Sequence, residues 1–313
     1  MTRSPDCPYF GPCGGCQLQN VEYEDQLRQK QSWLAETMRE VVFEEKIRPI
    51  LASPREWNYR RRIQLHVGPK GEVGFYGNRS RQVVEIERCL IADEKLNARI
   101  PQVRELAAEV LRQPRRPTSL TYELTLLEDG EVEIQREGEG EGRSFVQVNP
   151  EANQILIETL KKELVENSPS RVLELFAGSG NLSYALAQPD QVWIAVESDR
   201  RAVERGNELR GSAYPKMTWK AGAAAKVAAQ LFQSKQSFDL VLLDPPRGGA
   251  EDCLPVFRTH KPPRILYVSC NPAVLKKDLR VLSQAGYEIE WLQAIDFFPQ
   301  TMNLEVLAAL RQK

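Results

Sequence analysis

The sequence has few of the features that mark exported, membrane-inserted or disulfide-stabilised proteins. No apolar run in its 313 residues approaches the ~20 residues needed to cross a bilayer, and the first ten residues, MTRSPDCPYF, contain no apolar signal core. Six cysteines are too sparse for a disulfide scaffold. The 42 Lys and Arg residues nearly balance the 43 Asp and Glu residues, so any binding of nucleic acid must depend on local patches of charge. We therefore expect a cytoplasmic globular protein without a membrane partner.

Composition and patterning divide the chain into three segments. Residues 1–47 contain a Gly- and Pro-rich cysteine loop and then a stretch with helical spacing. Residues 48–143 alternate short strand-like runs with turns, including a hairpin expected around Asp129-Gly130, and predict a small central α+β domain. The acidic connector EGEGEG (137–142) precedes residues 144–313, in which four continuous apolar runs alternate with helical stretches. That alternation predicts a doubly wound, Rossmann-like α/β domain with a parallel sheet.

The four apolar runs end in candidate binding residues, because ligands bind beyond the carboxyl ends of parallel strands. The first run leads through a Gly-containing turn to Asn181, and the second ends at Glu197, which is placed to accept hydrogen bonds from ribose hydroxyls. The third ends in DPPR (244–247) and the fourth in SCNP (269–272). The turn lacks both the dinucleotide and the triphosphate fingerprints. S-adenosylmethionine fits best, since it carries a ribose and no phosphate.

Cys270 is the candidate nucleophile. It follows an apolar run and precedes Asn271-Pro272, where a helix is expected to begin because proline is favoured at the first helical position. A helix N-terminus stabilises a thiolate and lowers the pKa of a thiol. Position and electrostatics together therefore predict a reactive cysteine rather than a small core residue. Cys253 has no comparable context.

The other four cysteines form a possible metal site. Cys7, Cys13 and Cys16 lie in one Gly/Pro-rich loop, and Cys89 follows the strand-like runs of the central segment. Four thiolates can hold either Zn²⁺ or a [4Fe–4S] cluster, and the spacing alone leaves both open.

A candidate RNA-contact segment lies at the start of the central domain. It interleaves aromatic residues with arginines, a mixture that grips phosphates and stacks on splayed bases. Its members are Trp57, Tyr59, Arg60, Arg61 and Arg62.

Taken together, these motifs resemble those of the RNA uracil-5-methyltransferases that use S-adenosylmethionine. The resemblance covers nearly the whole chain, and its marks are FVQVN (145–149), LELFAGSGN (173–181), DPPRGG (244–249), YVSCNP (267–272) and DFFPQTMNLE (296–305). It implies that Cys270 attacks C6 of a uracil, so that C5 becomes an enolate carbon able to attack the sulfonium methyl group. Glu305 would then remove the C5 proton and allow the cysteine to leave.

The resemblance also implies cofactors and partners. The cofactor-contact positions would be Gln147, Phe176, Gly178, Asn181, Glu197 and Asp244, and Arg247 would contact RNA. The cysteine spacing resembles that of an iron–sulfur branch acting on 23S rRNA, which implies a [4Fe–4S] cluster and favours rRNA over tRNA as substrate. The family's N-terminal RNA-binding β-barrel is expected to be absent, because the cysteine motif begins at residue 7. We expect a monomer that binds RNA and not DNA.

Two departures from the family pattern leave alternatives open. Asn303 stands where the last motif commonly has His, and Ala223-Ala224-Ala225 replaces a usual polar side chain on the cofactor side. A noncatalytic iron–sulfur RNA-binding factor on a methyltransferase fold would explain both departures, but not the retained Cys270 and Glu305. Adenine amino-group and cytosine-5 methyltransferases are disfavoured, because Arg247 occupies the aromatic position of the first, and the Pro-Cys pair of the second occurs only at Pro12-Cys13.

Overall fold

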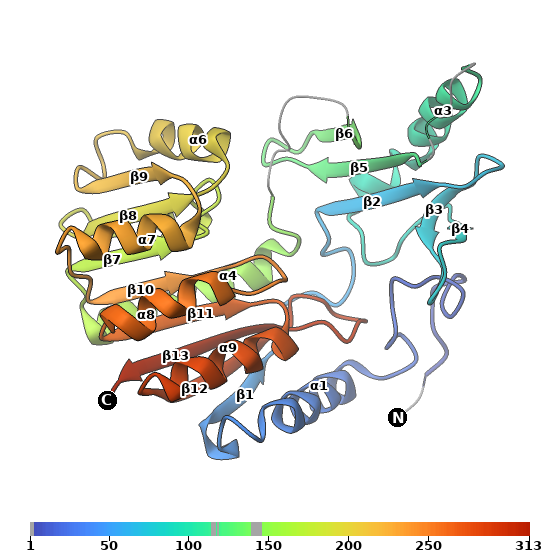
Figure 1. Ribbon diagram of the computed structural model, residues 1–313. Coiled ribbons are helices and arrows are strands. Elements are labelled where there is room, and N and C mark those ends of the chain that lie inside the picture. Colours follow the sequence, from blue (N-terminus) through green and yellow to red (C-terminus); the bar gives the residue numbers. More distant parts are fainter. Residues whose placement is uncertain (1–2, 114–116, 118, 139–145) are drawn as a thin grey trace. The chain divides into compact units, whose positions relative to one another are not determined.

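The computed structural model describes residues 3–113, 117, 119–138 and 146–313 and contains two sheets (Figure 1). The chain divides into two compact units that interleave along the sequence. The first unit comprises residues 1–29, 53–153 and 297–302, and the second comprises residues 30–52, 154–296 and 303–313. None of the helices in the described part of the chain is long and apolar enough to cross a membrane.

Eight strands form the sheet of the second unit within the described residues, in the order β1-β12-β13-β11-β10-β7-β8-β9. Their bounds are β1 Ile47–Leu51, β7 Arg171–Leu175, β8 Val192–Glu197, β9 Met217–Ala221, β10 Leu240–Leu243, β11 Arg264–Ser269, β12 Tyr287–Ile295 and β13 Glu305–Gln312. The four apolar runs of the sequence become β7, β8, β10 and β11, which are mutually parallel. This confirms the Rossmann-like α/β prediction.

Strand β13 departs from the parallel pattern, because it pairs antiparallel with both β11 and β12. Its register sets Ser269, at the end of β11, opposite Val306. An antiparallel strand begins at the edge where its neighbour ends. Glu305 at the start of β13 therefore lies at the edge of the sheet to which β11 delivers Cys270.

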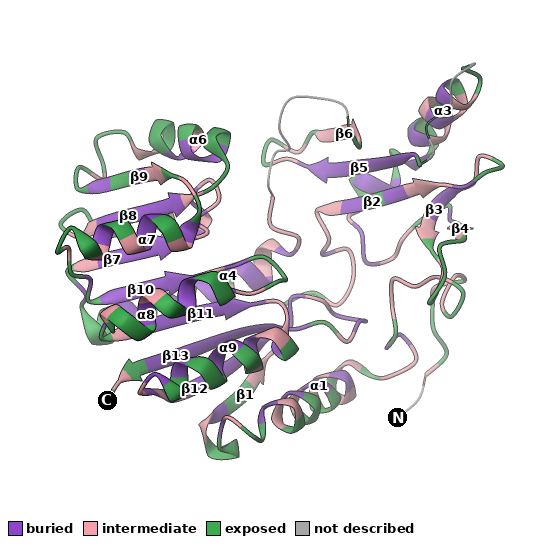
Figure 2. Cartoon of the chain, in the orientation of Figure 1, coloured by how far each residue is buried: buried purple, intermediate pink, exposed green. Residues whose placement is uncertain are grey.

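Helices cover the eight-stranded sheet. They are α1 Tyr23–Met38, α4 Pro150–Asn167, α5 Asn181–Leu186, α6 Arg200–Arg210, α7 Ala224–Gln233, α8 Leu254–His260 and α9 Pro272–Gln284, with short 3₁₀ turns at η1 Glu44–Lys46 and η2 Glu251–Cys253. Apolar residues of α7, α8, α9 and the second half of α1 join those of the strands in one core. Figure 2 shows the expected amphipathic pattern, with buried strands and exposed outer faces on the helices.

The first unit contains a five-stranded antiparallel sheet in the order β4-β3-β2-β5-β6. Its elements are β2 Arg62–Val67, β3 Val73–Tyr76, β4 Val83–Glu85, β5 Thr121–Leu126, β6 Val132–Arg136, α2 Glu94–Asn97 and α3 Ile100–Leu111. Residues of α3 pack on one face of this sheet. β5 and β6 form the hairpin predicted around Asp129-Gly130, where Gly130 has φ +85° as a tight turn requires.

The segment boundaries expected from the sequence agree only in part with the boundaries of the two units. Residues 48–51 belong to β1, which pairs in parallel with β12 and so lies in the large sheet rather than in the central domain. Residues 297–302, although close to the C-terminus, belong to the first unit. The boundary expected between 143 and 144 lies outside the described residues.

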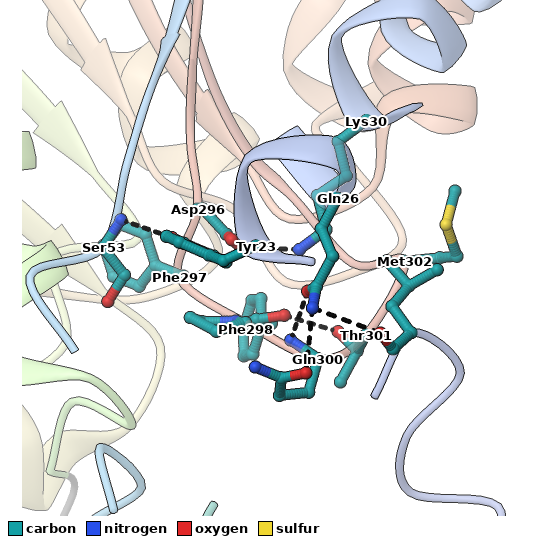
Figure 3. A network of polar contacts seen from close by, with 12 residues as sticks. Tyr23, Gln26, Lys30, Ser53, Asp296, Phe297, Phe298, Gln300, Thr301 and Met302 are labelled. Carbon is teal, nitrogen blue, oxygen red and sulfur yellow. Dashed lines mark hydrogen bonds and ion pairs between the residues drawn. The ribbon is translucent and has the colours of Figure 1, made fainter. Parts of the chain in front are cut away.

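A buried ion pair anchors the chain at the end of β12. Lys30 Nζ lies 2.7 Å from Asp296 Oδ1, and neither side chain has any exposed surface. One residue further on, the chain enters the first unit, where Gln26 Nε2 donates to Gln300 Oε1 at 2.9 Å and Gln300 N donates to Gln26 Oε1 at 3.0 Å (Figure 3). These contacts hold the segment that leads to β13 and Glu305.

Breaking this pair is expected to be costly, because Lys30→Met leaves the Asp296 carboxylate buried without its cation. We expect a loss of about 3–5 kcal/mol in the free energy of unfolding, measured by urea denaturation. Arg39→Met is the control, since it removes an exposed ion pair to Glu36 (2.9 Å) and should cost less than about 1 kcal/mol. If both substitutions lowered the free energy of unfolding by the same small amount, the buried pair would not contribute the stability expected of it.

Candidate active site

Cys270 occupies the turn between β11 and α9, as the sequence predicted. Asn271 caps α9 by accepting a hydrogen bond from Val274 N at 3.4 Å, and Pro272 is the first helical residue. The cysteine is half-buried and its thiol is free. The strand end thus presents the sulfur at the sheet edge where ligands of this fold class bind.

Three charged side chains surround the thiol. Burial, followed by the carboxyl groups of Glu305 and Asp244, raises the pKa of Cys270, while Arg247 lowers it through its charge and a hydrogen bond. The expectation that the helix N-terminus would lower this pKa is wrong for the protein alone, because burial and the two carboxyl groups outweigh the favourable contributions. Arg247 is the cation that stabilises the thiolate.

Burial raises the pKa of both carboxyl groups near the thiol. Burial raises the pKa of Asp244 to about 7. Burial and the nearby Asp244 raise the pKa of Glu305 well above its usual range, and Arg247 opposes this. A carboxyl group whose pKa lies near neutral pH can both take up and release a proton during a reaction.

A cavity of about 920 Å³, including open solvent, is lined by the two sequence neighbours of Arg247, Pro246 and Gly248. Of the predicted cofactor residues, Phe176 and Glu197 line it, and so do Ala223, Ala224 and Ala225. One Glu197 carboxylate oxygen accepts from Gly178 N at 3.0 Å, and the other accepts from Ser198 N at 2.6 Å. Glu197 therefore joins the Gly-containing turn to the end of β8.

The remaining predicted cofactor residues take other places. Asn181 begins α5, and Asp244 lies with Cys270 rather than among the cavity-lining residues. Gln147 is half-buried and belongs to the first unit.

Several residues of this region were missed in the sequence. Gly248, Gly249, Ala250 and Cys253 line the cavity, and the motif DPPRGG was the signal that could have pointed to the first two. The buried carboxylate of Glu174 accepts from Ser183 Oγ at 2.5 Å and Trp193 Nε1 at 2.7 Å. This last network joins three separate elements, so no local pattern in the sequence could have revealed it.

The four cysteines of the first unit line a second, separate cavity. Cys7, Cys13, Cys16 and Cys89 surround it together with Arg60. The Nε of Arg60 is buried and, among the described residues, has no hydrogen-bond partner. An anionic group held by the thiols would satisfy this nitrogen, and four thiols are the kind of donor set that a thiolate-bound cluster requires. No group of three or more His, Cys, Asp or Glu side chains in the described chain is arranged to hold a metal ion, and the metal centre stays a prediction.

The candidate RNA-contact residues are largely engaged within the first unit. Tyr59 is 1% exposed and donates its hydroxyl to Pro299 O at 3.0 Å, so its ring is not free to stack on a base, and the predicted contact is wrong for this residue. Trp57 is half-buried with the Arg3 guanidinium 5.5 Å from its ring centre. Arg61 Nη2 donates to Leu127 O at 2.8 Å, and Arg62 Nε lies 3.9 Å from Glu123.

Comparison with known proteins agrees with this geometry. The family profile described as tRNA (Uracil-5-)-methyltransferase matches residues 228–313, and one described as Conserved hypothetical protein 95 matches residues 151–261. The chain is 30% identical over 362 residues to 23S rRNA (uracil(1939)-C(5))-methyltransferase RlmD of Klebsiella pneumoniae, covering 99% of this chain and 82% of that protein. It is 32% identical over 330 residues to an uncharacterised RNA methyltransferase of Bdellovibrio bacteriovorus, covering 99% and 79%.

Among solved structures, the tRNA (uracil-54, C5)-methyltransferase of Pyrococcus abyssi, in complex with S-adenosyl-L-homocysteine, superposes with a TM-score of 0.73. It is 22% identical, and the match covers 95% of this chain and 85% of that one. The fold is therefore that of the S-adenosylmethionine-dependent methyltransferases. With the sequence relatives, it follows that the chain belongs to the RNA uracil-5-methyltransferase family and is an RNA methyltransferase.

Burial of Glu174 makes the free energy of unfolding depend on pH. Burial raises its native-state pKa to about 7 from an ordinary value of 4.5, so between these pH values the native state binds more protons than the unfolded state. Stability must therefore fall as pH rises through this range, by on the order of 3 kcal/mol for this group.

We expect Glu174→Gln to make the free energy of unfolding less dependent on pH between pH 4.5 and 7, as measured by urea denaturation. Glu208→Gln, at an exposed position on α6, is the matched control and should leave the slope unchanged. An unchanged slope in Glu174→Gln would contradict the raised pKa.

Proposed function

We propose that this protein methylates C5 of a uridine in 23S rRNA, with S-adenosylmethionine as methyl donor. The convergence of Cys270, Asp244, Glu305 and Arg247 beside the cofactor-sized cavity is the observation that carries the proposal. The 23S rRNA substrate is supported by the RlmD relatives, which cover the chain at 30% identity or more, whereas the tRNA enzyme resembles it at 22%. The catalytic reading fits better than a noncatalytic RNA-binding factor, because both reactive groups are present.

The residues of the cavity fit the nucleoside part of S-adenosylmethionine. Glu197 is placed to accept hydrogen bonds from ribose hydroxyls, although its oxygens already bind backbone amides. Ala223, Ala224 and Ala225 offer an apolar wall with small side chains, which suits a flat adenine ring. When bound, the cofactor supplies an electrophilic methyl group, and the protein need only hold it near the target base.

The chain's own residues would perform the remaining steps. The half-buried Cys270 thiol loses its proton to solvent water, and Arg247 stabilises the resulting thiolate. The thiolate attacks C6 of the uracil and moves electron density to C5. After C5 has been methylated, the Glu305 carboxylate takes the C5 proton, and its raised pKa means that it binds a proton more strongly than an ordinary glutamate does. Loss of that proton restores the C5–C6 double bond and expels the Cys270 thiolate.

Trapping with 5-fluorouridine-substituted 23S rRNA tests this chemistry. Fluorine at C5 cannot leave as a proton, so the wild-type protein with S-adenosylmethionine should form an adduct that survives denaturing electrophoresis. Cys270→Ala should lower the yield of the adduct at least about 100-fold relative to the wild type, because the nucleophile is missing. Tyr287→Phe removes a buried hydroxyl of the same unit outside the cavity lining and should trap normally.

An adduct that persists in Cys270→Ala would overturn the assigned nucleophile. Absence of any adduct with 23S rRNA, but formation with fluorinated tRNA, would move the substrate to tRNA. Absence with both, under conditions in which the cofactor binds, would favour the noncatalytic RNA-binding factor.

We further propose that Cys7, Cys13, Cys16 and Cys89 hold a [4Fe–4S] cluster. The proposal is supported by the shared cavity, by the buried and unpartnered Arg60 nitrogen among the described residues, and by the resemblance of the cysteine spacing. Hydrogen bonds and charges around the sulfurs of such a cluster tune its properties, and Arg60 and Gln19, which also line the cavity, could do this.

Protein purified without oxygen should contain about four iron and four sulfide per chain. Cys16→Ser should lose most of the iron because a ligand is removed, whereas Cys253→Ser should retain it. Elemental analysis measures both, and it also separates the alternatives: one zinc per chain without sulfide would replace the cluster by a zinc site.

A further inference from the structure

The loop after β10 links the cofactor cavity to the nucleophile. Arg247 lies at its exposed tip, where its backbone oxygen accepts a hydrogen bond from the side chain of Asn271, the neighbour of Cys270, at 3.1 Å, and its charge lowers the pKa of the Cys270 thiol. The next three residues, Gly248 to Ala250, line the cavity. The position of this loop therefore sets the distance between the stabilising guanidinium and the sulfur. A small displacement of the loop would weaken that interaction.

A buried hydrogen-bonded cluster, the Tyr267–Asp278 node, holds the C-terminal end of the loop at Ala250. The Tyr267 hydroxyl donates to Asp278 Oδ2 at 2.5 Å, and the backbone N–H of Ala250 donates to both oxygens, each at 3.0 Å. Tyr267 and Asp278 are 0% and 3% exposed. Tyr267 lies on β11, three residues before Cys270, and Asp278 lies on α9, which begins just after it. The node thus ties the loop to the two elements that hold the nucleophile.

Two further contacts show how tightly the loop is held. Asn271, the residue after Cys270, donates its side-chain amide to Arg247 O at 3.1 Å. Gly249 has φ +85°, and a Cβ at this position would lie 2.4 Å from Val274 Cγ1 and 2.8 Å from Asp278 Oδ2. Only glycine allows this conformation and this close approach to α9. The loop is therefore attached on both sides of its glycine pair.

We propose that Tyr267 and Asp278 are a positioning pair that clamps the loop after β10 to β11 and α9 and so holds Arg247 against Cys270. Neither side chain needs to touch substrate or cofactor, because each acts through the loop backbone. The inference rests on the proposed function only in assigning Cys270 as the nucleophile. It predicts that loosening the node changes the reactivity of a sulfur that the node does not contact.

The test measures alkylation of Cys270 by iodoacetamide as a function of pH, resolved by peptide mass spectrometry. The charged groups that face this sulfur are Glu305, Arg247 and Asp244. Tyr267→Phe should raise the pH midpoint of alkylation by about one unit, so that the rate at neutral pH falls about tenfold, since the thiolate is the reactive form. The matched control is Tyr287→Phe, which removes another buried hydroxyl, hydrogen-bonded to Pro262 O at 2.8 Å, away from the loop.

A double-mutant cycle shows whether the effect passes through Arg247. Arg247→Met alone should raise the midpoint, and adding Tyr267→Phe should then produce little further change, because coupled residues are not additive. Full additivity, an unchanged midpoint in Tyr267→Phe, or an equal shift in Tyr287→Phe would each overturn the proposal. If Tyr267→Phe does not fold, Asp278→Asn replaces it in the same cycle.

The readout needs neither RNA nor methyl transfer, so it separates this inference from the proposed function. If Tyr267→Phe shifts the pH midpoint of Cys270 alkylation but the wild type is not trapped by fluorouridine RNA, the positioning role of Tyr267 and Asp278 stands and the proposed reaction is rejected. Trapping in the wild type without a midpoint shift would retain the reaction and reject the clamp.

Discussion

The antiparallel pairing of β13 with β11 is the constraint on which the site depends. Because β13 runs against β11, its first residue lies at the edge where β11 ends, and the register Ser269 to Val306 brings Glu305 to the side of Cys270. A parallel strand in this position would carry its first residue to the opposite edge of the sheet. The two groups that the proposed reaction needs are 35 residues apart in sequence and meet only through this pairing.

Burial gives the site its electrostatic character. Asp244, Glu305 and Cys270 all have pKa values raised by burial, and Arg247 is the nearby cation that opposes the change for Cys270 and Glu305. This arrangement keeps the thiol protonated until its surroundings change, and it gives Asp244 a pKa of about 7, at which a carboxyl group can exchange protons near neutral pH. The loop that carries Arg247 is correspondingly well anchored, by the Tyr267–Asp278 node on one side and by Asn271 on the other.

Local patterns predicted the parts of this structure that local physics determines. The four apolar runs became parallel strands, and the residues at their ends gathered at one edge, since strand ends are visible as sequence motifs. The sequence did not show that β13 is antiparallel, that β1 joins the large sheet or that Tyr59 is buried, because these depend on partners distant in the chain. The direction of the Cys270 pKa was missed for the same reason: the helix N-terminus is local, but the burial that raises the pKa and the nearby carboxyl groups of Glu305 and Asp244 depend on distant parts of the chain.

Tritium release measures directly whether Cys270 activates C5 of uridine and whether the protein then removes the C5 proton. Unmodified 23S rRNA carrying tritium at uridine C5 is incubated with the protein and S-adenosylmethionine, and the tritium in water is compared with the methyl groups incorporated. We expect equal amounts of both for the wild type and neither product for Cys270→Ala. Methyl incorporation without tritium release would contradict this expectation, because the methyl group would then have entered a position other than C5.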